Sequence, residues 1–171
     1  MRIDDCRVCF SHGQESGPWG YKITAMADVA RDRGAAVESL DYRGMPDPSE
    51  RVRKLVAWGG SVETPLILVG SSMGGHVAAA ASAELEVAAL FLLAPAFYMP
   101  GYEALTPAAR AGRITIVHGW NDEIVPAANI VRWAEEHGAE LHLLNGDHRL
   151  TDNIAQINRL FDGFLRDVAA G

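Results

Sequence analysis

The sequence predicts an α/β fold, a doubly wound, mostly parallel six-stranded sheet flanked by helices. Apolar runs alternate with helix-periodic segments along the whole chain. Two of these runs, 66–69 and 90–93, are apolar on both faces, as strands must be in a parallel sheet that helices cover. With 171 residues the chain can bury one complete core, so we expect a single domain over residues 1–171.

The individual elements follow from apolar periodicity and from helix-ending residues. Strands are expected near 6–10, 36–41, 65–70, 87–93, 113–118 and 139–144. Gly34 ends the first expected helix, and Pro48 is a favourable first-turn residue for the second. The helices are expected near 21–33, 48–58, 75–83, 126–137 and 154–168. The apolar stripe of the last helix predicts core packing.

Composition and charge exclude several classes of function. The hydrophobic fraction is 49%, and no apolar run approaches the ~20 residues of a membrane-spanning helix, so we expect no membrane partner. The net charge is −7 and the basic residues form no stripe, which disfavours nucleic acid as a partner. The amino terminus lacks the pattern of a secretory signal, so a cytoplasmic location is expected.

The two cysteines, Cys6 and Cys9, have the spacing of a redox pair. Both fall within the first expected strand, where an odd offset points side chains to opposite faces. We therefore interpret them as buried structural thiols. No cluster of histidines and cysteines has the spacing of a zinc site, so no metal is expected.

The most informative motif is Gly70-Ser71-Ser72-Met73-Gly74, between an apolar strand and a helix. A serine on such a strand-to-helix turn adopts a strained backbone, and glycines two residues to either side remove side chains that would collide there. Ser72 is therefore the candidate nucleophile, with an ordinary glycine-serine turn as the alternative.

A serine nucleophile needs a base and an acid, and candidates for both follow in the chain. Asp122 follows the strand near 113–118, with Glu123 and Asp147 as competing carboxylates. His148 follows the strand near 139–144. Two other histidines in strand-end loops, His12 and His118, precede glycines and are expected to shape their turns through side-chain hydrogen bonds.

Acyl transfer also needs two donors for the developing oxyanion, and backbone N–H groups usually supply them. Met73 directly follows the nucleophile and is one candidate. Gln14, in the glycine-rich loop after the first strand, is the other. Aromatic side chains expected to wall the substrate pocket, with packing as the alternative, are Trp19, Phe97, Tyr98 and Trp120.

Four motifs together resemble a small serine hydrolase of the α/β-hydrolase superfamily. They are Phe10-Ser11-His12-Gly13, the segment 70–75, the segment 118–126 (HGWNDEIVP) and Asp147-His148-Arg149-Leu150. The chain is similar to compact, nearly lidless esterases and to thioesterase-like members. The resemblance implies a minimal α/β-hydrolase fold with Ser72, Asp122 and His148 as nucleophile, acid and base.

The expected function is cleavage of small acyl esters through an acyl-enzyme on Ser72, without a cofactor. A thioesterase or an amidase could use the same three residues, and a non-catalytic binding protein could have the same fold. The expected partner is a small-molecule ester or thioester, and the oligomeric state stays open. Nicotinamide and nucleoside phosphate sites are disfavoured, because the glycine-rich segments lack the residues that these ligands need.

Overall fold

A computed structural model describes residues 1–171. Its centre is a six-stranded sheet in which every neighbouring pair is parallel, in the order β2-β1-β3-β4-β5-β6. The strands are β1 (Arg7–Ser11), β2 (Ala36–Leu40), β3 (Leu66–Ser71), β4 (Ala89–Leu93), β5 (Arg113–Gly119) and β6 (Glu140–Leu144). The predicted fold class is confirmed.

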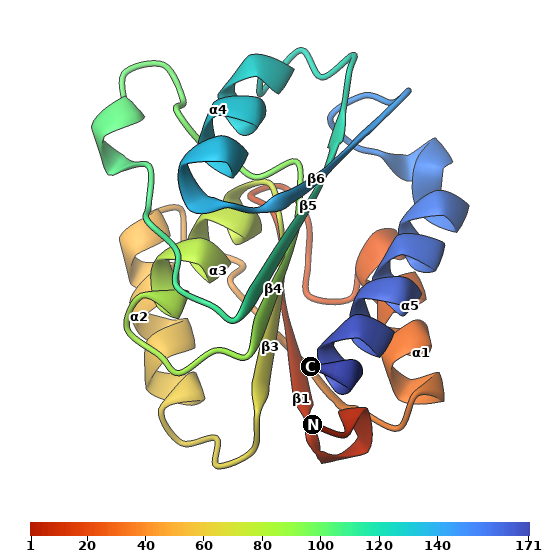
Figure 1. The fold of residues 1–171 in the computed structure, drawn as a ribbon. Helices are drawn as coiled ribbons and strands as arrows, with labels where there is room; N and C mark the ends of the chain where they lie inside the picture. Colours follow the sequence, from red (N-terminus) through yellow and green to blue (C-terminus); the bar gives the residue numbers. More distant parts are fainter.

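Five helices connect the strands and cover both faces of the sheet (Figure 1). They are α1 (Tyr21–Asp32), α2 (Pro48–Gly59), α3 (Met73–Ser82), α4 (Ala127–His137) and α5 (Ile154–Ala170). Short 3₁₀ turns lie at η1 (Ile3–Asp5), η2 (Glu103–Leu105) and η3 (Thr151–Asn153). None of the helices is long and apolar enough to cross a membrane.

The helix ends follow from local chemistry that the sequence indicates. The side chain of Asp47 accepts a hydrogen bond from the Ser49 amide and so caps α2, in which Pro48 occupies the first turn. Gly138 ends α4 with φ of 60°, a left-handed conformation that glycine adopts without strain. The predicted helix boundaries therefore agree with the observed ones to within about two residues.

Two apolar layers hold the helices to the sheet. Helices α1 and α5 pack on one face and α2, α3 and α4 on the other (Figure 1). Cys6 belongs to the first layer and Cys9 to the second, and both thiols are buried and free. Cys6 precedes β1 and so lies just outside the strand that was expected to contain it, but the two thiols lie on opposite sides of the sheet, as expected.

The strand order creates a crevice between β1 and β3. From β1 the chain proceeds to β2 on one side, whereas β3 and all later strands add on the other side. In open α/β sheets, ligands bind at such a reversal, outside the carboxyl ends of the strands. Ser11 ends β1 and Ser71 ends β3, so the loops that follow them flank this crevice.

Candidate active site

Ser72 lies on a strained turn between β3 and α3. Its φ of 55° and ψ of −118° are values that L-residues rarely adopt. Two backbone hydrogen bonds hold the turn: Ser72 N–H donates to Leu93 O at 2.9 Å, and Ala96 N–H donates to Ser72 O at 3.0 Å. The adjoining strand β4 thus fixes the position of the serine.

The glycines around Ser72 are required by close approach of the backbone. A Cβ on Gly70 would lie 2.2 Å from Gly74 O, and one on Gly74 would lie 1.9 Å from Ser11 O. Real Cβ atoms do not approach backbone oxygens so closely. The motif therefore lets β1, β3 and α3 meet tightly beneath the serine.

Ser72, His148 and Asp122 form one continuous chain of hydrogen bonds. Ser72 Oγ lies 2.9 Å from His148 Nε2, and His148 Nδ1 lies 2.7 Å from Asp122 Oδ2. These residues follow β3, β5 and β6, whose carboxyl ends lie along the same edge of the sheet, with β4 between β3 and β5. The structure therefore brings together the three side chains that the sequence predicts to act together.

The Asp122 side chain has no exposed surface and uses both of its oxygens. Oδ1 accepts the backbone N–H groups of Ile124 and Val125 at 2.8 and 2.7 Å, and Oδ2 faces His148. Of the two competing carboxylates, Asp147 caps the turn at Leu150, and Glu123 is exposed. Asp122 is thus the carboxylate that contacts His148.

His118 is a further group beside this chain. It is fully buried, its Nε2 lies 2.9 Å from Val125 O, and the same nitrogen lies 3.5 Å from Asp122 Oδ2. Because a carbonyl only accepts, Nε2 carries a proton and donates it. Burial lowers the pKa of His118, so the ring stays neutral and acts as a donor that holds the turn. The expected turn-shaping role is confirmed.

The two residues proposed as oxyanion donors both lie near the nucleophile. Met73 is the first residue of α3, so its N–H has no acceptor within the helix. The loop after β1 approaches from the other side: a Cβ on Gly13 would lie 3.6 Å from Ser72 Cβ. Gln14, which follows Gly13, lines the same cleft as Ser72. Both candidate oxyanion donors thus lie near Ser72, and their role stays a prediction.

A cleft of about 520 Å³ opens beside Ser72 and His148. Its walls are the loop after β1, the first turn of α1 and the loop after β6, and only 3 of its 16 lining residues are hydrophobic. Lys22 and Arg149 contribute positive charge to it and Glu15 negative charge. The cleft is therefore a polar one.

The four aromatic residues expected to wall the pocket do not line this cleft. Phe97 is fully buried and stacks on Trp133 at 4.5 Å between ring centroids, so the expectation of a substrate contact is wrong for this residue. Tyr98 binds Glu136 of α4 through its hydroxyl, on the α4 side of the sheet. Trp19 and Trp120 are largely exposed. Packing, the alternative interpretation, holds for Phe97 and Tyr98.

Sequence reasoning missed two charged residues near the site. Lys22 lies in the cleft and donates a hydrogen bond to the Arg149 carbonyl, next to His148. Arg51 lies buried beneath the loop after β1. The spacing of Arg51, Leu55 and Gly59 in α2 was a usable signal, because it puts an arginine on the buried stripe of an amphipathic helix.

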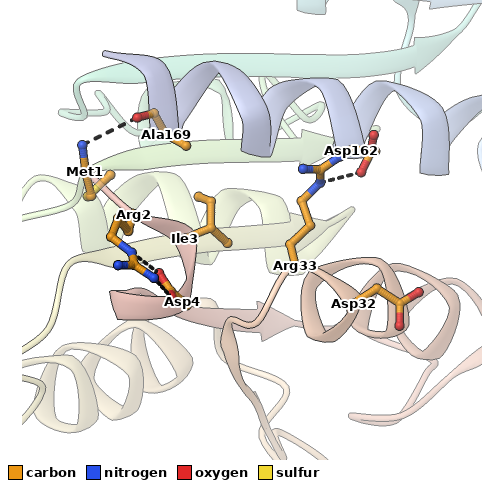
Figure 2. Close-up of a pocket in the computed structure, with 8 residues that line it drawn as sticks. All are labelled: Met1, Arg2, Ile3, Asp4, Asp32, Arg33, Asp162 and Ala169. Carbon is orange, nitrogen blue, oxygen red and sulfur yellow. Dashed lines mark hydrogen bonds and ion pairs between the residues drawn. The ribbon is translucent and has the colours of Figure 1, made fainter.

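A second cavity, of about 610 Å³, lies at the opposite end of the sheet, near the chain termini (Figure 2). Figure 2 shows two ion pairs among its charged side chains, Arg2 with Asp4 and Arg33 with Asp162, while Asp32 forms no ion pair with the other residues drawn. No serine, cysteine or histidine lines it. The chemistry-bearing side chains thus gather at the carboxyl ends of the strands.

The comparisons with known proteins agree with this geometry. A family model described as the alpha/beta hydrolase family matches residues 10–170. The chain belongs to the alpha/beta hydrolase family. No curated protein matches the sequence.

Among solved structures, this alpha/beta hydrolase is similar to a presumed hydrolase of the superfamily from Xanthomonas campestris pv. campestris. The two share 33% identity and a TM-score of 0.86, over 94% of this chain and 98% of the other. A lidless α/β serine hydrolase from X. campestris gives 20% identity and a TM-score of 0.80, over 98% and 84%. Est1E from Butyrivibrio proteoclasticus, with ferulic acid bound, gives 17% and 0.80, over 98% and 91%. The last two show likeness of fold alone.

Proposed function

We propose that this alpha/beta hydrolase is a serine hydrolase that cleaves small, polar carboxylic esters through an acyl-enzyme on Ser72. The observation that carries the proposal is the unbroken hydrogen-bonded chain from Ser72 Oγ through His148 to Asp122. A serine hydroxyl is a weak nucleophile at neutral pH, and this arrangement is the one that activates it.

The direction of the hydrogen bonds fits proton transfer from the serine. Asp122 Oδ2 accepts the Nδ1 proton of His148, which leaves the Nε2 lone pair facing Ser72 Oγ. As Oγ bonds to the ester carbonyl carbon, Nε2 takes the hydroxyl proton. The carbonyl oxygen becomes an oxyanion, for which the N–H groups of Met73 and Gln14 are the proposed donors.

The remaining steps return the enzyme to its starting state. The tetrahedral intermediate collapses, the C–O bond to the alcohol breaks, and His148 gives its proton to the departing alkoxide. Water then attacks the Ser72 ester while His148 takes one of its protons. Collapse of the second intermediate releases the carboxylic acid, and Ser72 Oγ regains a proton from His148.

A fluorophosphonate probe and the Ser72→Ala variant test this proposal together. The wild-type protein is expected to bind one probe per chain at Ser72 and to hydrolyse p-nitrophenyl acetate. Ser72→Ala is expected to lose labelling and to lower kcat by roughly 10⁴-fold or more. Absence of labelling in folded wild-type protein would favour a non-catalytic binding protein, and near-normal turnover by Ser72→Ala would exclude Ser72 as the nucleophile.

The cleft supports a short, polar acyl group. An apolar channel would gain about 0.8 kcal/mol, or about fourfold in binding, for each buried methylene. The cleft beside Ser72 has few apolar residues, and Phe97 lies in the core, so this cleft offers little apolar surface to a long acyl chain. The segment between β4 and β5, near 94–112, carries only the three-residue turn η2 and packs against α4 through Tyr98.

A series of p-nitrophenyl esters tests this substrate class. We expect kcat/KM to be highest for acetyl to butyryl esters, to fall for dodecanoyl esters, and to survive EDTA. The succinyl ester, matched to the butyryl ester in length, measures tolerance of added polarity and is expected to be hydrolysed at least as well. A steady rise in kcat/KM with chain length, or activation by emulsified long-chain triglyceride, would contradict the proposal.

A further inference from the structure

We propose that Arg51, in the buried stripe of α2, is a positioning residue that aims the Gln14 N–H at the oxyanion by holding the Gly13 carbonyl from behind. The proposal rests on the proposed acyl transfer at Ser72. It gives a role in the reaction to a side chain that touches neither the substrate nor the three proposed catalytic groups.

Arg51 is an unusual residue to find in the core. It is 2% exposed, and its guanidinium contacts backbone carbonyls rather than a carboxylate. Nη1 donates to the carbonyls of His12 and Gly13 at 3.1 and 3.2 Å, and Nε donates to Met45 O at 2.7 Å. Burying a charge without an ionic partner is costly, and an apolar residue would fill the same space. The side chain is therefore best explained by the backbone that it binds.

The hydrogen bonds of this region converge on one peptide group. The Gly13 carbonyl accepts from Arg51 Nη1 and from His12 Nδ1 at 2.7 Å, and also from the exposed Ser16 Oγ at the longer distance of 3.5 Å. The tautomer of His12 is fixed, because its Nε2 accepts the Tyr42 N–H at 2.8 Å. Burial lowers the pKa of His12, which keeps the ring neutral and this arrangement intact.

Because the peptide bond is planar, the hydrogen bonds to the Gly13 carbonyl also fix the direction of the Gln14 N–H. The C=O of Gly13 and the N–H of Gln14 belong to one planar, trans peptide, so they point in opposite directions. The carbonyl faces the buried Arg51, whereas Gly13 and Gln14 line the cleft together with Ser72. Donors that hold the carbonyl on the buried side therefore direct the N–H toward the cleft.

The forked guanidinium explains why this position holds an arginine. Its Nη1 and Nε reach the loop after β1 and, through Met45, the segment between β2 and α2 at the same time. The Tyr42 ring lies 5.4 Å from the guanidinium carbon and adds a favourable face for the charge. A lysine ammonium is a point charge and cannot span the same acceptors in a fixed orientation.

The test compares Arg51→Met, Arg51→Lys and the control Arg53→Met, an exposed arginine of the same helix. Turnover is counted per active site titrated with the fluorophosphonate, so that misfolded protein does not count. Removal of one oxyanion donor typically costs 10²–10³ in kcat, so a loosened donor should lower kcat by about 10- to 100-fold in both Arg51 variants, with KM within about threefold. Arg53→Met is expected to match the wild type.

A transition-state analogue separates positioning from simple stability. A trifluoromethyl ketone places an oxyanion on the donors when Ser72 adds to it, so its inhibition constant should weaken in parallel with kcat. The midpoint of the pH profile should not move, because His148 and Asp122 are unchanged. If Arg51→Met does not fold, Arg51→Lys decides the question by the same measurements.

Two results would be distinct failures. If the wild type neither labels nor hydrolyses esters, the proposed function itself is wrong. If the wild type is active, but an Arg51 variant keeps wild-type kcat per titrated site and wild-type affinity for the trifluoromethyl ketone, then Arg51 only stabilises the fold and the positioning proposal is overturned.

Discussion

The two carboxylate oxygens of Asp122 have separate roles at the site. One carboxylate oxygen receives two backbone N–H groups that fix the turn after β5, and the other is left for His148. A buried carboxylate needs this many donors, since an unsatisfied charge in the interior is costly. The same contacts that make Asp122 tolerable in the core also orient it toward the imidazole.

Asp122→Asn therefore tests the acid assignment at the level of single atoms. The amide keeps the shape and can keep the Oδ1 contacts, but its NH₂ can donate to His148 Nδ1 and so favour the wrong tautomer. We expect kcat/KM to fall by about 10³–10⁴-fold, as for similar arrangements. Steady-state kinetics on p-nitrophenyl acetate measures this loss.

The matched controls are Glu123→Gln and Asp147→Asn. Glu123 is exposed, and an asparagine at position 147 keeps an oxygen to accept the Leu150 N–H, so both should change the rate by less than about threefold. A larger loss from Asp147→Asn than from Asp122→Asn would refute the assignment.

Residues that carry chemistry were easier to predict than residues that support it. Ser72 and His148 follow strands in the sequence. The carboxyl ends of parallel strands lie at one edge of the sheet, so residues that follow them lie near one another regardless of the conformation of the loops. Phe97 also follows a strand, yet its side chain turns into the core against Trp133, and no local pattern encodes that direction. Arg51 was missed because two of its three hydrogen bonds reach carbonyls that lie 39 and 38 positions away in the chain.

At the scale of elements, the site depends on how closely β1, β3 and α3 approach one another. The carbonyl that ends β1 lies where a side chain on Gly74 would have to be. This contact also brings the loop with Gly13 beside Ser72. The spacing of the elements and the geometry of the proposed oxyanion donors are thus set by the same glycine.

Gly74→Ala is expected to separate α3 from β1 and to harm both stability and activity. A Cβ there would lie 1.9 Å from Ser11 O, a backbone atom that cannot rotate away. We expect the free energy of unfolding to fall by at least about 2 kcal/mol, in the upper range for an overpacked core. Urea unfolding monitored by tryptophan fluorescence provides the measurement.

Gly163→Ala is the matched control for this substitution. Gly163 lies inside α5, and a Cβ there has no neighbour closer than 3.9 Å. Replacement of an interior helical glycine by alanine should raise stability by roughly 0.5–1 kcal/mol. Equal stability changes in the two variants would show that the close approach at Gly74 does not matter.

At the scale of the whole molecule, periodicity was enough to predict the fold. The central strands β3 and β4 read as apolar on both faces because helices cover both faces of the sheet. The edge strands β2 and β6 are less buried, and their sequences mix polar and apolar residues. Their positions could still be predicted, because the end of the preceding helix indicates where each strand begins. The conformation of the segment near 94–112 could not be predicted. It depends on a few individual contacts with α4, such as those of Tyr98 with Glu136 and of Trp133 with Pro107, which no periodic pattern encodes.

Two buried histidines, His12 and His118, and the half-buried His76 also give the whole molecule a predictable response to acid. Burial lowers the pKa of His12, His76 and His118 below the ordinary value of 6.5. The unfolded chain therefore binds more protons than the folded protein once the pH falls below about 6.5. Stability is fully present above that pH and is lost as the pH falls from there toward the folded-state values.

We accordingly expect the free energy of unfolding to decrease between pH 7 and pH 5, by up to about 1.4 kcal/mol per pH unit for each histidine that stays neutral in the folded state. Urea titrations at pH 7, 6 and 5 measure this slope. The variant His118→Gln, whose amide can still donate to Val125 O, should reduce the slope even if it changes the stability at pH 7, because its unfolded chain has one histidine fewer to bind a proton. A free energy of unfolding that stays constant or rises on acidification over this range would show that these rings are protonated in the folded protein, contrary to their lowered pKa values.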